Sequence, residues 1–285
     1  MVELLESTTA VRAAVSAARD SGRRVGLVPT MGALHSGHAR LIERCRSQSG
    51  LTIVSIFVNP TQFGPSEDFG RYPRSLDDDL KLCAGSDAHV VFAPNVQTMY
   101  PNGLHSTAVE LAQLTDTLEG ASRPGHFRGV ATVVLKLFEI VRPHLACFGQ
   151  KDYQQQLVIK RMVEDLHLGV EIDTCPTIRE ADGLAMSSRN RYLKPDERNA
   201  AGVLFRALEN ARMATTAGER EASRVRQILR ETIESEPLAR LDYAEVSSAE
   251  TLEPLEFLNQ GGRAVALLAV RIGNTRLIDN MPLGA

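Results

Sequence analysis

The sequence contains no apolar stretch approaching the ~20 residues that a membrane span requires. Its first residues, MVELLESTTAVRAAV, open acidic and lack the basic-then-apolar pattern of a secretory signal peptide. The few cysteines lie far apart without a CxxC pair, which argues against zinc and against a disulfide framework. They are Cys45, Cys83, Cys147 and Cys175. We therefore expect a cytoplasmic protein without a membrane partner.

An excess of charge of one sign is also missing. The chain has 32 Lys and Arg against 35 Asp and Glu, and a net charge of -3 gives no general attraction to nucleic acid. The turn after the first long apolar run lacks GxGxxG, which argues against a dinucleotide-binding dehydrogenase. With 285 residues, 43% of them hydrophobic, the chain is long enough for one large globular domain or two ordinary ones.

Short apolar runs alternate with helical patterns over most of the chain, which predicts βαβ units and a parallel sheet. The strand-like runs cover residues 24–29, 51–58, 88–94, 144–149 and 170–178. Later residues instead show two amphipathic helices (195–218 and 219–235), then two strands around a Gly273-Asn274 turn. The predicted fold class is α/β, with a Rossmann-like parallel-sheet domain over 1–178 and a smaller α+β C-terminal domain over 179–285.

Three polar motifs each follow a predicted strand: PTMGALHSGH (29–38), NPTQFG (59–64) and GQKDYQQ (149–155). Ligands of open parallel sheets sit at the carboxyl ends of strands. We therefore expect the three loops to converge on one crevice.

His35 and His38 stand where an apolar run ends and a helix begins. Taken alone, they could be a solvated and a capping histidine, and a metal site would need further ligands. Gly37 permits close approach to a ligand, and a helix N-terminus offers N–H groups to an anion. Those features favour histidines that donate to phosphate oxygens.

The second motif is LAMSSRNRYL, residues 184–193, which alone could be a turn with an exposed charge. Together with the early HxGH motif, it resembles the class I aminoacyl-tRNA synthetase and nucleotidyltransferase superfamily. Members of that superfamily use ATP through its α-phosphate.

Longer blocks narrow the resemblance. PTMGALHSGH, SIFVNPTQFGPSEDFGRYPR, HFRGVATVVLKLFEIVRP, FGQKDYQQ and READGLAMSSRNRYL occur in order over roughly residues 28–193. The chain thus resembles the pantoate–β-alanine ligases, differing from the common pattern at Ser36 and Gln150. The resemblance implies ATP-dependent condensation of (R)-pantoate with β-alanine to pantothenate, AMP and pyrophosphate through a pantoyl adenylate. It also implies Mg²⁺ and a homodimer.

The resemblance also implies the roles of individual residues. Those acting on ATP and its transition state are His35, His38, Lys151, Ser187, Ser188 and Arg189. Further ATP contacts are Pro29, Thr30, Met31, Gly32, Gly149, Asp152, Ile178 and Met186. Pantoate contacts are Gln62, Gln155, Asn59, Phe57 and Met31.

Neutral amides suit pantoate, because a tight ion pair would blunt the nucleophilicity of its carboxylate. Asp78 or Asp79 is the candidate for helping Mg²⁺, and an acidic run favoured by the helix dipole is an equal alternative.

Other function classes predict different products. A nucleotidyltransferase would need additional basic residues for a second phosphate and would release a dinucleotide. A tRNA synthetase would need room for an anticodon domain and a basic face, which 285 residues with a net charge of -3 do not offer. A non-enzymatic metabolite-binding module would bind ATP without releasing pyrophosphate.

Overall fold

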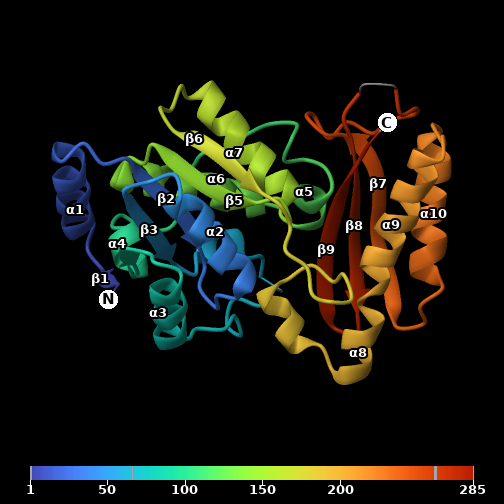
Figure 1. Cartoon of the computed structure of the whole chain (residues 1–285), viewed down its shortest axis with the longest axis horizontal. Helices are drawn as coiled ribbons and strands as arrows, with labels where there is room; N and C mark the ends of the chain where they lie inside the picture. The colour runs from blue at the N-terminus through green and yellow to red at the C-terminus, as the bar shows by residue number, and fades with distance from the viewer. Residues whose placement is uncertain (1, 66, 260–261, 285) are drawn as a thin grey trace. The chain divides into compact units, whose positions relative to one another are not determined.

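The computed structural model describes residues 2–65, 67–259 and 262–284. The chain divides into two compact units (Figure 1). The first comprises the residues up to Gln150 together with Gln154–Pro176. The second comprises Lys151–Tyr153 and the residues from Thr177 onward. The sequence-based boundary at 178/179 thus lies close to Thr177, but the pattern gave no sign that three residues after the fifth strand group with the second unit.

The first unit is built on a six-stranded sheet in which every pair of neighbours is parallel, as predicted. In space the order is β1-β4-β3-β2-β5-β6. The strands are β1 (Glu3–Leu5), β2 (Val25–Thr30), β3 (Leu51–Ile56), β4 (Val90–Phe92), β5 (Leu145–Gly149) and β6 (Glu171–Cys175). The central strands are short runs buried on both faces, as a sheet covered by helices requires.

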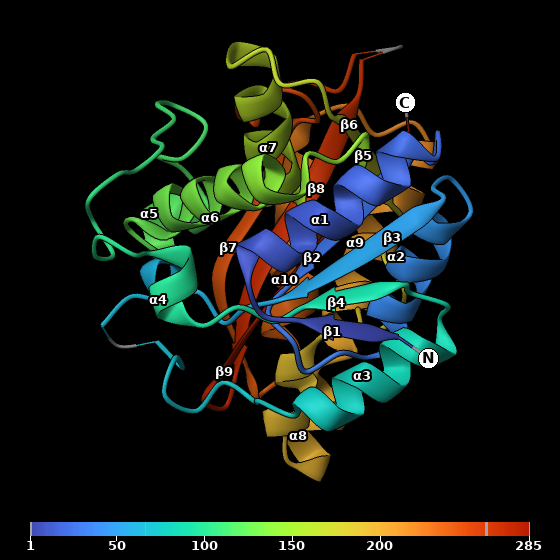
Figure 2. The ribbon, with the colours of Figure 1, turned by 90° about the vertical axis from the view of Figure 1, so that its left-hand side faces the viewer.

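Helices cover both faces of this sheet. They are α1 (Thr8–Asp20), α2 (Ser36–Arg46), α3 (Leu76–Gly85), α4 (Val96–Met99), α5 (Glu119–Ser122), α6 (His126–Val141) and α7 (Tyr153–Asp165), with a 3-10 turn η1 (Pro60–Gln62). Figure 2 shows α1 and α6 lying across one face, where Val15 and Phe138 belong to one buried cluster. On the other face, Ile42 of α2 and Cys83 of α3 belong to a second cluster. The two helical layers fix the positions of the strand ends and of the loops that follow them.

The second unit packs helices against a three-stranded antiparallel sheet. Its elements are η2 (Ser188–Tyr192), α8 (Pro195–Ala200), α9 (Val203–Thr216), α10 (Ala222–Glu234), β7 (Ala239–Ser248), β8 (Ala264–Ile272) and β9 (Thr275–Leu283). The predicted hairpin is confirmed, with Gly273 at φ 55°. The single helix expected over 195–218 is wrong, because the chain turns at Ala201 and Gly202 and forms α8 and α9. Among the described residues of either unit, every helix falls short of what a membrane span requires.

Candidate active site

The loop after β2 has an unusual backbone. Gly32 has φ 84° and its neighbour Ala33 has φ 50°, so two successive residues adopt the left-handed conformation. This conformation is open to glycine and costly for alanine. The loop therefore needs external contacts to hold it, and it ends one residue before the first of the two histidines.

A buried carboxylate supplies those contacts. Asp79 on α3 is 2% exposed, and its Oδ2 accepts a hydrogen bond from the Ala33 N–H at 3.0 Å. Its Oδ1 accepts from the Leu34 N–H at 2.7 Å. A Cβ on Gly32 would lie 2.9 Å from Oδ2, so a side chain at Gly32 would disturb the same contact. Asp79 thus fixes the approach to His35.

Both histidines have their Nδ1 atoms occupied by backbone donors. His35 is the N-cap of α2, and its Nδ1 accepts from the Gly37 N–H at 3.1 Å. The Nδ1 of His38 accepts from the His35 N–H at 3.3 Å, and the ring centroids are 4.1 Å apart. A neutral imidazole that accepts at Nδ1 carries its proton on Nε2. Each ring is therefore a donor at Nε2, at the positive end of an 11-residue helix.

The turn after β3 places two amides together. Asn59 and Gln62 are buried, and the Asn59 Nδ2 donates to the Gln62 Oε1 at 3.1 Å. The Gln62 Nε2 lies 2.9 Å from the Met31 Sδ. Met31 belongs to the loop between β2 and His35, which we call the histidine loop. Tyr100 donates its hydroxyl to the Asn59 Oδ1 at 2.8 Å. The loops after β2 and β3 are thus in direct contact, as their neighbouring strands predict.

Behind Gln62 lies a set of residues that the sequence reasoning missed. His126 Nδ1 donates to the Gln62 carbonyl at 2.8 Å, and Arg123 donates to the same oxygen at 3.3 Å. Arg123 also pairs with Glu67 at 2.7 Å. Burial, assisted by the positive charge of Arg123, lowers the pKa of His126 to about 4. His126 is therefore neutral. It lies in the block HFRGVA, which contributes to the family resemblance but contains no local sign of this contact.

Tight packing fixes the same turn from α6. A Cβ on Gly129 would lie 2.3 Å from the Thr61 carbonyl oxygen, so only glycine fits there. The Gly129 carbonyl in turn accepts from the Asn59 Nδ2 at 3.1 Å. The apolar helix and the amide turn therefore pack backbone to backbone.

The loop after β5 carries the predicted lysine. Lys151 is largely buried, with 20% of its side chain exposed, and its Nζ lies 3.9 Å from the Asp152 Oδ1. Its carbonyl accepts from the Asn280 Nδ2 of β9 at 2.8 Å. Gln155, in the first turn of α7, is half-buried, whereas its neighbour Gln154 is buried and bonded to backbone groups around Thr117. Gln155 is thus the more accessible of these two amides.

In the second unit, a buried ion pair holds the segment that leads to the Met-Ser-Ser-Arg motif. Arg179 donates to both carboxylate oxygens of Asp279, at 2.6 and 3.1 Å, and to the Gly183 carbonyl at 3.0 Å. The Asp279 side chain is fully buried, and burial raises its pKa while Arg179 opposes the shift. Phe205 lies under the Arg179 guanidinium at 4.8 Å. The segment is thereby anchored to Asp279 of β9. The next residue, Asn280, is the one that bonds the Lys151 carbonyl.

The motif itself forms the start of η2. Ser187 is its N-cap, and its hydroxyl accepts from the Arg189 N–H at 3.3 Å. Met186 donates its N–H to the Ile178 carbonyl at 2.9 Å, which closes the segment into a loop. Ser187, Ser188 and Arg189 are half-buried. Lys151 and this loop are therefore tied to adjacent residues of one strand.

Several of the remaining predicted residues lie in the first unit. Phe57 is buried beside Tyr100, and Pro29 and Thr30 end β2. Gly149 is the last residue of β5. Asp78 is exposed and pairs with Lys81 at 3.0 Å.

A comparison with protein-family models matches residues 3–282 to the family described as pantoate-beta-alanine ligase. A pantothenate synthetase from Moorella thermoacetica is 57% identical over 282 residues, covering 99% of each chain. One from Pelotomaculum thermopropionicum is 56% identical over 274 residues, covering 96% of each.

Solved structures agree with these relatives. The chain is similar to pantothenate synthetase from Thermus thermophilus, with a TM-score of 0.93, 44% identity and complete coverage of both chains. It is also similar to a Francisella tularensis pantoate-beta-alanine ligase complexed with beta-gamma ATP and beta-alanine. That comparison has a TM-score of 0.80 and 34% identity, and it covers 99% of this chain and 97% of the other.

Proposed function

Because this chain belongs to the pantoate–β-alanine ligase family, we propose that the residues described above in each of the two units serve ATP-dependent condensation of pantoate with β-alanine. The first half-reaction joins a pantoate carboxylate oxygen to the α-phosphorus of ATP and releases pyrophosphate. In the second, the β-alanine amine attacks the acyl carbon and AMP leaves, so that pantothenate forms. The family relationship and the similar ATP- and β-alanine-bound ligase support this reaction.

Negative charge accumulates on the pyrophosphate as it leaves. Donors placed where that charge grows lower the barrier more than they tighten ground-state binding. We assign this role to His35 and His38. The observation that carries the assignment is that both Nδ1 atoms accept backbone N–H groups, so both Nε2 atoms are donors at a helix N-terminus. Two neutral donors fit a polyanion without a prior change of protonation.

The family resemblance assigns Lys151, Ser187, Ser188 and Arg189 to the same phosphates. The anchoring of Lys151 and of the Met-Ser-Ser-Arg loop to Asn280 and Asp279 supports this, because it lowers the conformational entropy lost on binding. Asp152, Ile178 and Met186 would contact the nucleoside part, with Pro29, Thr30, Met31, Gly32 and Gly149 along the strand ends.

Pantoate is assigned to the amides. Gln62 is already oriented by Asn59 and Met31, and its main chain is held by His126 and Arg123. A neutral amide can bond pantoate's hydroxyl and carboxylate oxygens without pairing the attacking carboxylate with a cation. Gln155 would supply the second amide, and Phe57 an apolar wall.

Mg²⁺, when bound with ATP, would neutralise phosphate oxygens. Of the two candidate carboxylates, Asp78 fits better, because it is exposed on α3 and its ion pair is with Lys81, one helical turn away. Both oxygens of Asp79 accept loop N–H groups in a buried setting. We therefore propose Asp78 for the metal and Asp79 as a positioning residue for the histidine loop.

The family resemblance also supports a homodimer in the cytoplasm, and all four cysteines are free thiols, which fits a reducing compartment. Sedimentation velocity over a range of concentrations tests the dimer.

The reaction is tested by isotope exchange. With ATP, Mg²⁺ and pantoate but no β-alanine, labelled pyrophosphate should enter ATP, because adenylation is reversible. Omitting pantoate is the control and should abolish exchange. Formation of ADP instead would mean an acyl phosphate, and ATP binding without exchange would mean a non-catalytic module.

A further inference from the structure

Three of the four cysteines, far apart in the sequence, meet on one face of the first unit's sheet. Cys147 on β5 and Cys175 on β6 face the same side, because Cys147 pairs in register with Asp173 and Cys175 lies two residues further along β6. Cys45 comes from α2, which covers that face, and all three are buried. The neighbouring Cys175 and Cys45 thiols, together with burial, raise the pKa of the Cys147 thiol, and the Cys147 thiol lowers the pKa of Cys175 and of Cys45.

A carboxylate stands among these sulfurs. One ligand atom each from Cys147, Asp173 and Cys175 lies within 4.8 Å of the others. Tetrahedral zinc, with Zn–S bonds of about 2.3 Å, separates its ligand atoms by roughly 3.8 Å. Side-chain rotations that move these ligand atoms by about 1 Å or less would therefore allow all three to bind one cation.

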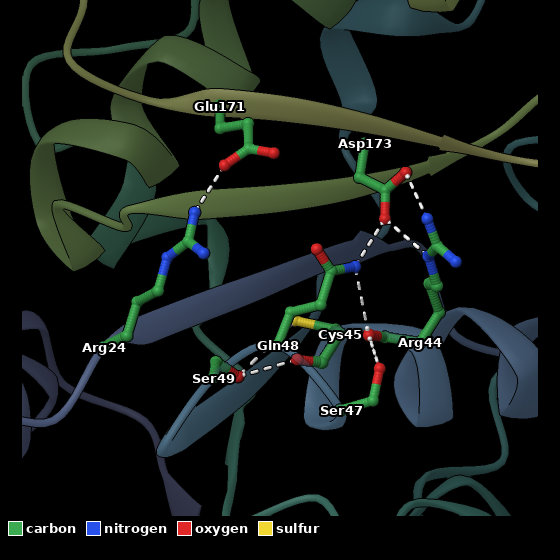
Figure 3. A network of polar contacts seen from close by, with 8 residues as sticks. All are labelled: Arg24, Arg44, Cys45, Ser47, Gln48, Ser49, Glu171 and Asp173. Atoms are coloured by element: carbon green, nitrogen blue, oxygen red, sulfur yellow. Dashed lines mark hydrogen bonds and ion pairs between the residues drawn. The ribbon is translucent and has the colours of Figure 1, made fainter.

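The carboxylate is held from α2 and the turn after it. Figure 3 shows Asp173 facing Arg44 and Gln48. The Asp173 Oδ2 accepts from the Arg44 Nε at 2.7 Å and from the Gln48 Nε2 at 2.6 Å. Its Oδ1 has a longer contact, 3.4 Å, with the Arg44 Nη2. Oδ1 is thus the oxygen with capacity to bind a metal while Oδ2 keeps its donors.

Charge balances with and without a cation. Without one, the two thiols are neutral and Asp173 is paired with Arg44. With one, two thiolates and a carboxylate carry three negative charges, which a divalent cation and Arg44 offset. Asp173 is 14% exposed at its side chain, so the position opens toward solvent beneath the Arg44 guanidinium.

We propose that Cys147, Cys175 and Asp173 form a binding site for a thiophilic divalent cation of the zinc class. Binding of M²⁺ forms two metal–sulfur bonds and one metal–oxygen bond and releases the two thiol protons to solvent. Two sulfurs and a carboxylate favour zinc-class metals over Mg²⁺, which prefers oxygen ligands. The cation would clamp β5 to β6 beneath α2, the helix whose first turn carries His38.

Cadmium provides a direct probe, because thiolate–Cd²⁺ bonds have their own ultraviolet charge-transfer absorption. The full chain, kept reduced with a phosphine and free of ATP, should show this band with one Cd²⁺ per chain and release two protons. Cys147→Ala and Cys175→Ala should each lose the band. Cys83→Ala is the matched control: Cys83 is buried in the same cluster, burial raises its pKa to about 12, and it should leave the band unchanged.

Asp173→Asn keeps the shape of the site and should weaken Cd²⁺ binding by about tenfold or more. This variant also serves if the alanine variants do not fold, as checked by circular dichroism. Absence of the band in the wild-type chain would overturn the proposal. An equal band in folded Cys147→Ala and Cys175→Ala, or unchanged affinity in Asp173→Asn, would do so as well. ATP is left out, so the result is independent of the ligase reaction.

Discussion

Each unit contains a buried aspartate that fixes a loop with proposed catalytic residues, and the two do so through different partners. In the first unit, Asp79 accepts two N–H groups from the histidine loop itself. In the second, Asp279 accepts from Arg179, and the arginine then reaches the loop carbonyl of Gly183. Both aspartates are 2% exposed. The histidine loop therefore depends on hydrogen bonds to a buried carboxylate, and the other loop on a partly buried guanidinium that a buried carboxylate holds.

This difference determines what each substitution leaves behind. Removing Asp279 leaves a guanidinium without its counter-ion, and a buried unpaired charge is among the most costly defects. Removing Asp79 leaves two neutral N–H groups and a strained Ala33 without their acceptor. Removing Asp279 should therefore mainly lower stability, whereas removing Asp79 should mainly disturb the backbone geometry of the histidine loop.

The largest effect is expected for Asp279→Ala. Leaving Arg179, whose side chain is 19% exposed, without its partner should lower the free energy of unfolding by about 3–5 kcal/mol. Urea unfolding measures this loss. The double variant Arg179→Met, Asp279→Leu is the control, because it removes both charges and should recover most of the stability. A loss below about 1 kcal/mol in Asp279→Ala would show that the pair is effectively solvated.

The next effect concerns rate. His38→Ala should lower kcat by about 10²–10³-fold with little change in the KM for ATP, because its donor acts on charge that grows as pyrophosphate leaves. His38→Asn keeps an amide donor near the same position and should recover part of the rate. Steady-state kinetics at saturating pantoate checks both variants. A rise in KM at unchanged kcat would instead assign His38 to ground-state binding.

Asp79→Asn tests the first loop. Its amide nitrogen would face one of the two backbone N–H groups, and one unsatisfied donor costs about 1–3 kcal/mol of stability. As a positioning residue, it should also lower kcat while the KM for pantoate stays near that of the wild type. Asp78→Asn is the neighbouring control and should leave stability within about 0.5 kcal/mol. A raised Mg²⁺ requirement in Asp78→Asn, absent from Asp79→Asn, would separate the metal role from the positioning role.

Much of the fold could be predicted because apolar runs in this chain end at recognisable turn sequences. The run before the Pro-Thr-Met-Gly turn became β2, and Gly273-Asn274 became the hairpin turn. The strand β1 and helix α1 were not predicted. Residues 195–218 keep one amphipathic pattern across Gly202, so nothing in that periodicity marks the break between α8 and α9.

The candidate site could be predicted only for residues that lie in local sequence motifs. His35, His38 and Gln62 lie within short conspicuous blocks. Asp79, His126 and Arg179 act from other elements, and their contacts depend on which segments the fold brings together. The same holds for the cysteines: spacing argued against a metal site, yet Cys147 and Cys175 lie on adjacent parallel strands. Two parallel strands that pair are separated in the sequence by a helix, so the contacts between their side chains cannot be recognised from residue spacing.

The amide turn gives a smaller effect than the histidines. Gln62→Ala should lower kcat/KM for pantoate by about ten- to hundredfold, the cost of one unpaired buried hydrogen-bonding group. The KM for ATP should stay nearly constant. Gln62→Glu should be worse than alanine, because it sets a second negative charge beside the carboxylate of pantoate. Wild-type pantoate kinetics in Gln62→Glu would place the pantoate contacts elsewhere.

The smallest expected effect is a pH dependence of folding stability that arises from His126, the residue that holds the Gln62 carbonyl. The pKa of His126 is lowered to about 4 from its ordinary 6.5, chiefly by burial. Below 6.5 the unfolded chain gains a proton on this residue that the folded chain does not take up until about pH 4. This group's contribution to stability is therefore fully present above pH 6.5 and is lost as the pH falls from there toward 4.

Between neutral pH and about pH 5.5, the loss amounts to roughly 1 kcal/mol from this one group. His126→Gln removes the titration while keeping a side-chain donor for the Gln62 carbonyl. Urea unfolding of both proteins at the two pH values isolates the contribution, because the other titrating groups are common to both. The wild-type chain should lose about 1 kcal/mol more than the variant. Equal losses would mean that the pKa of His126 is the same in the folded and the unfolded chain.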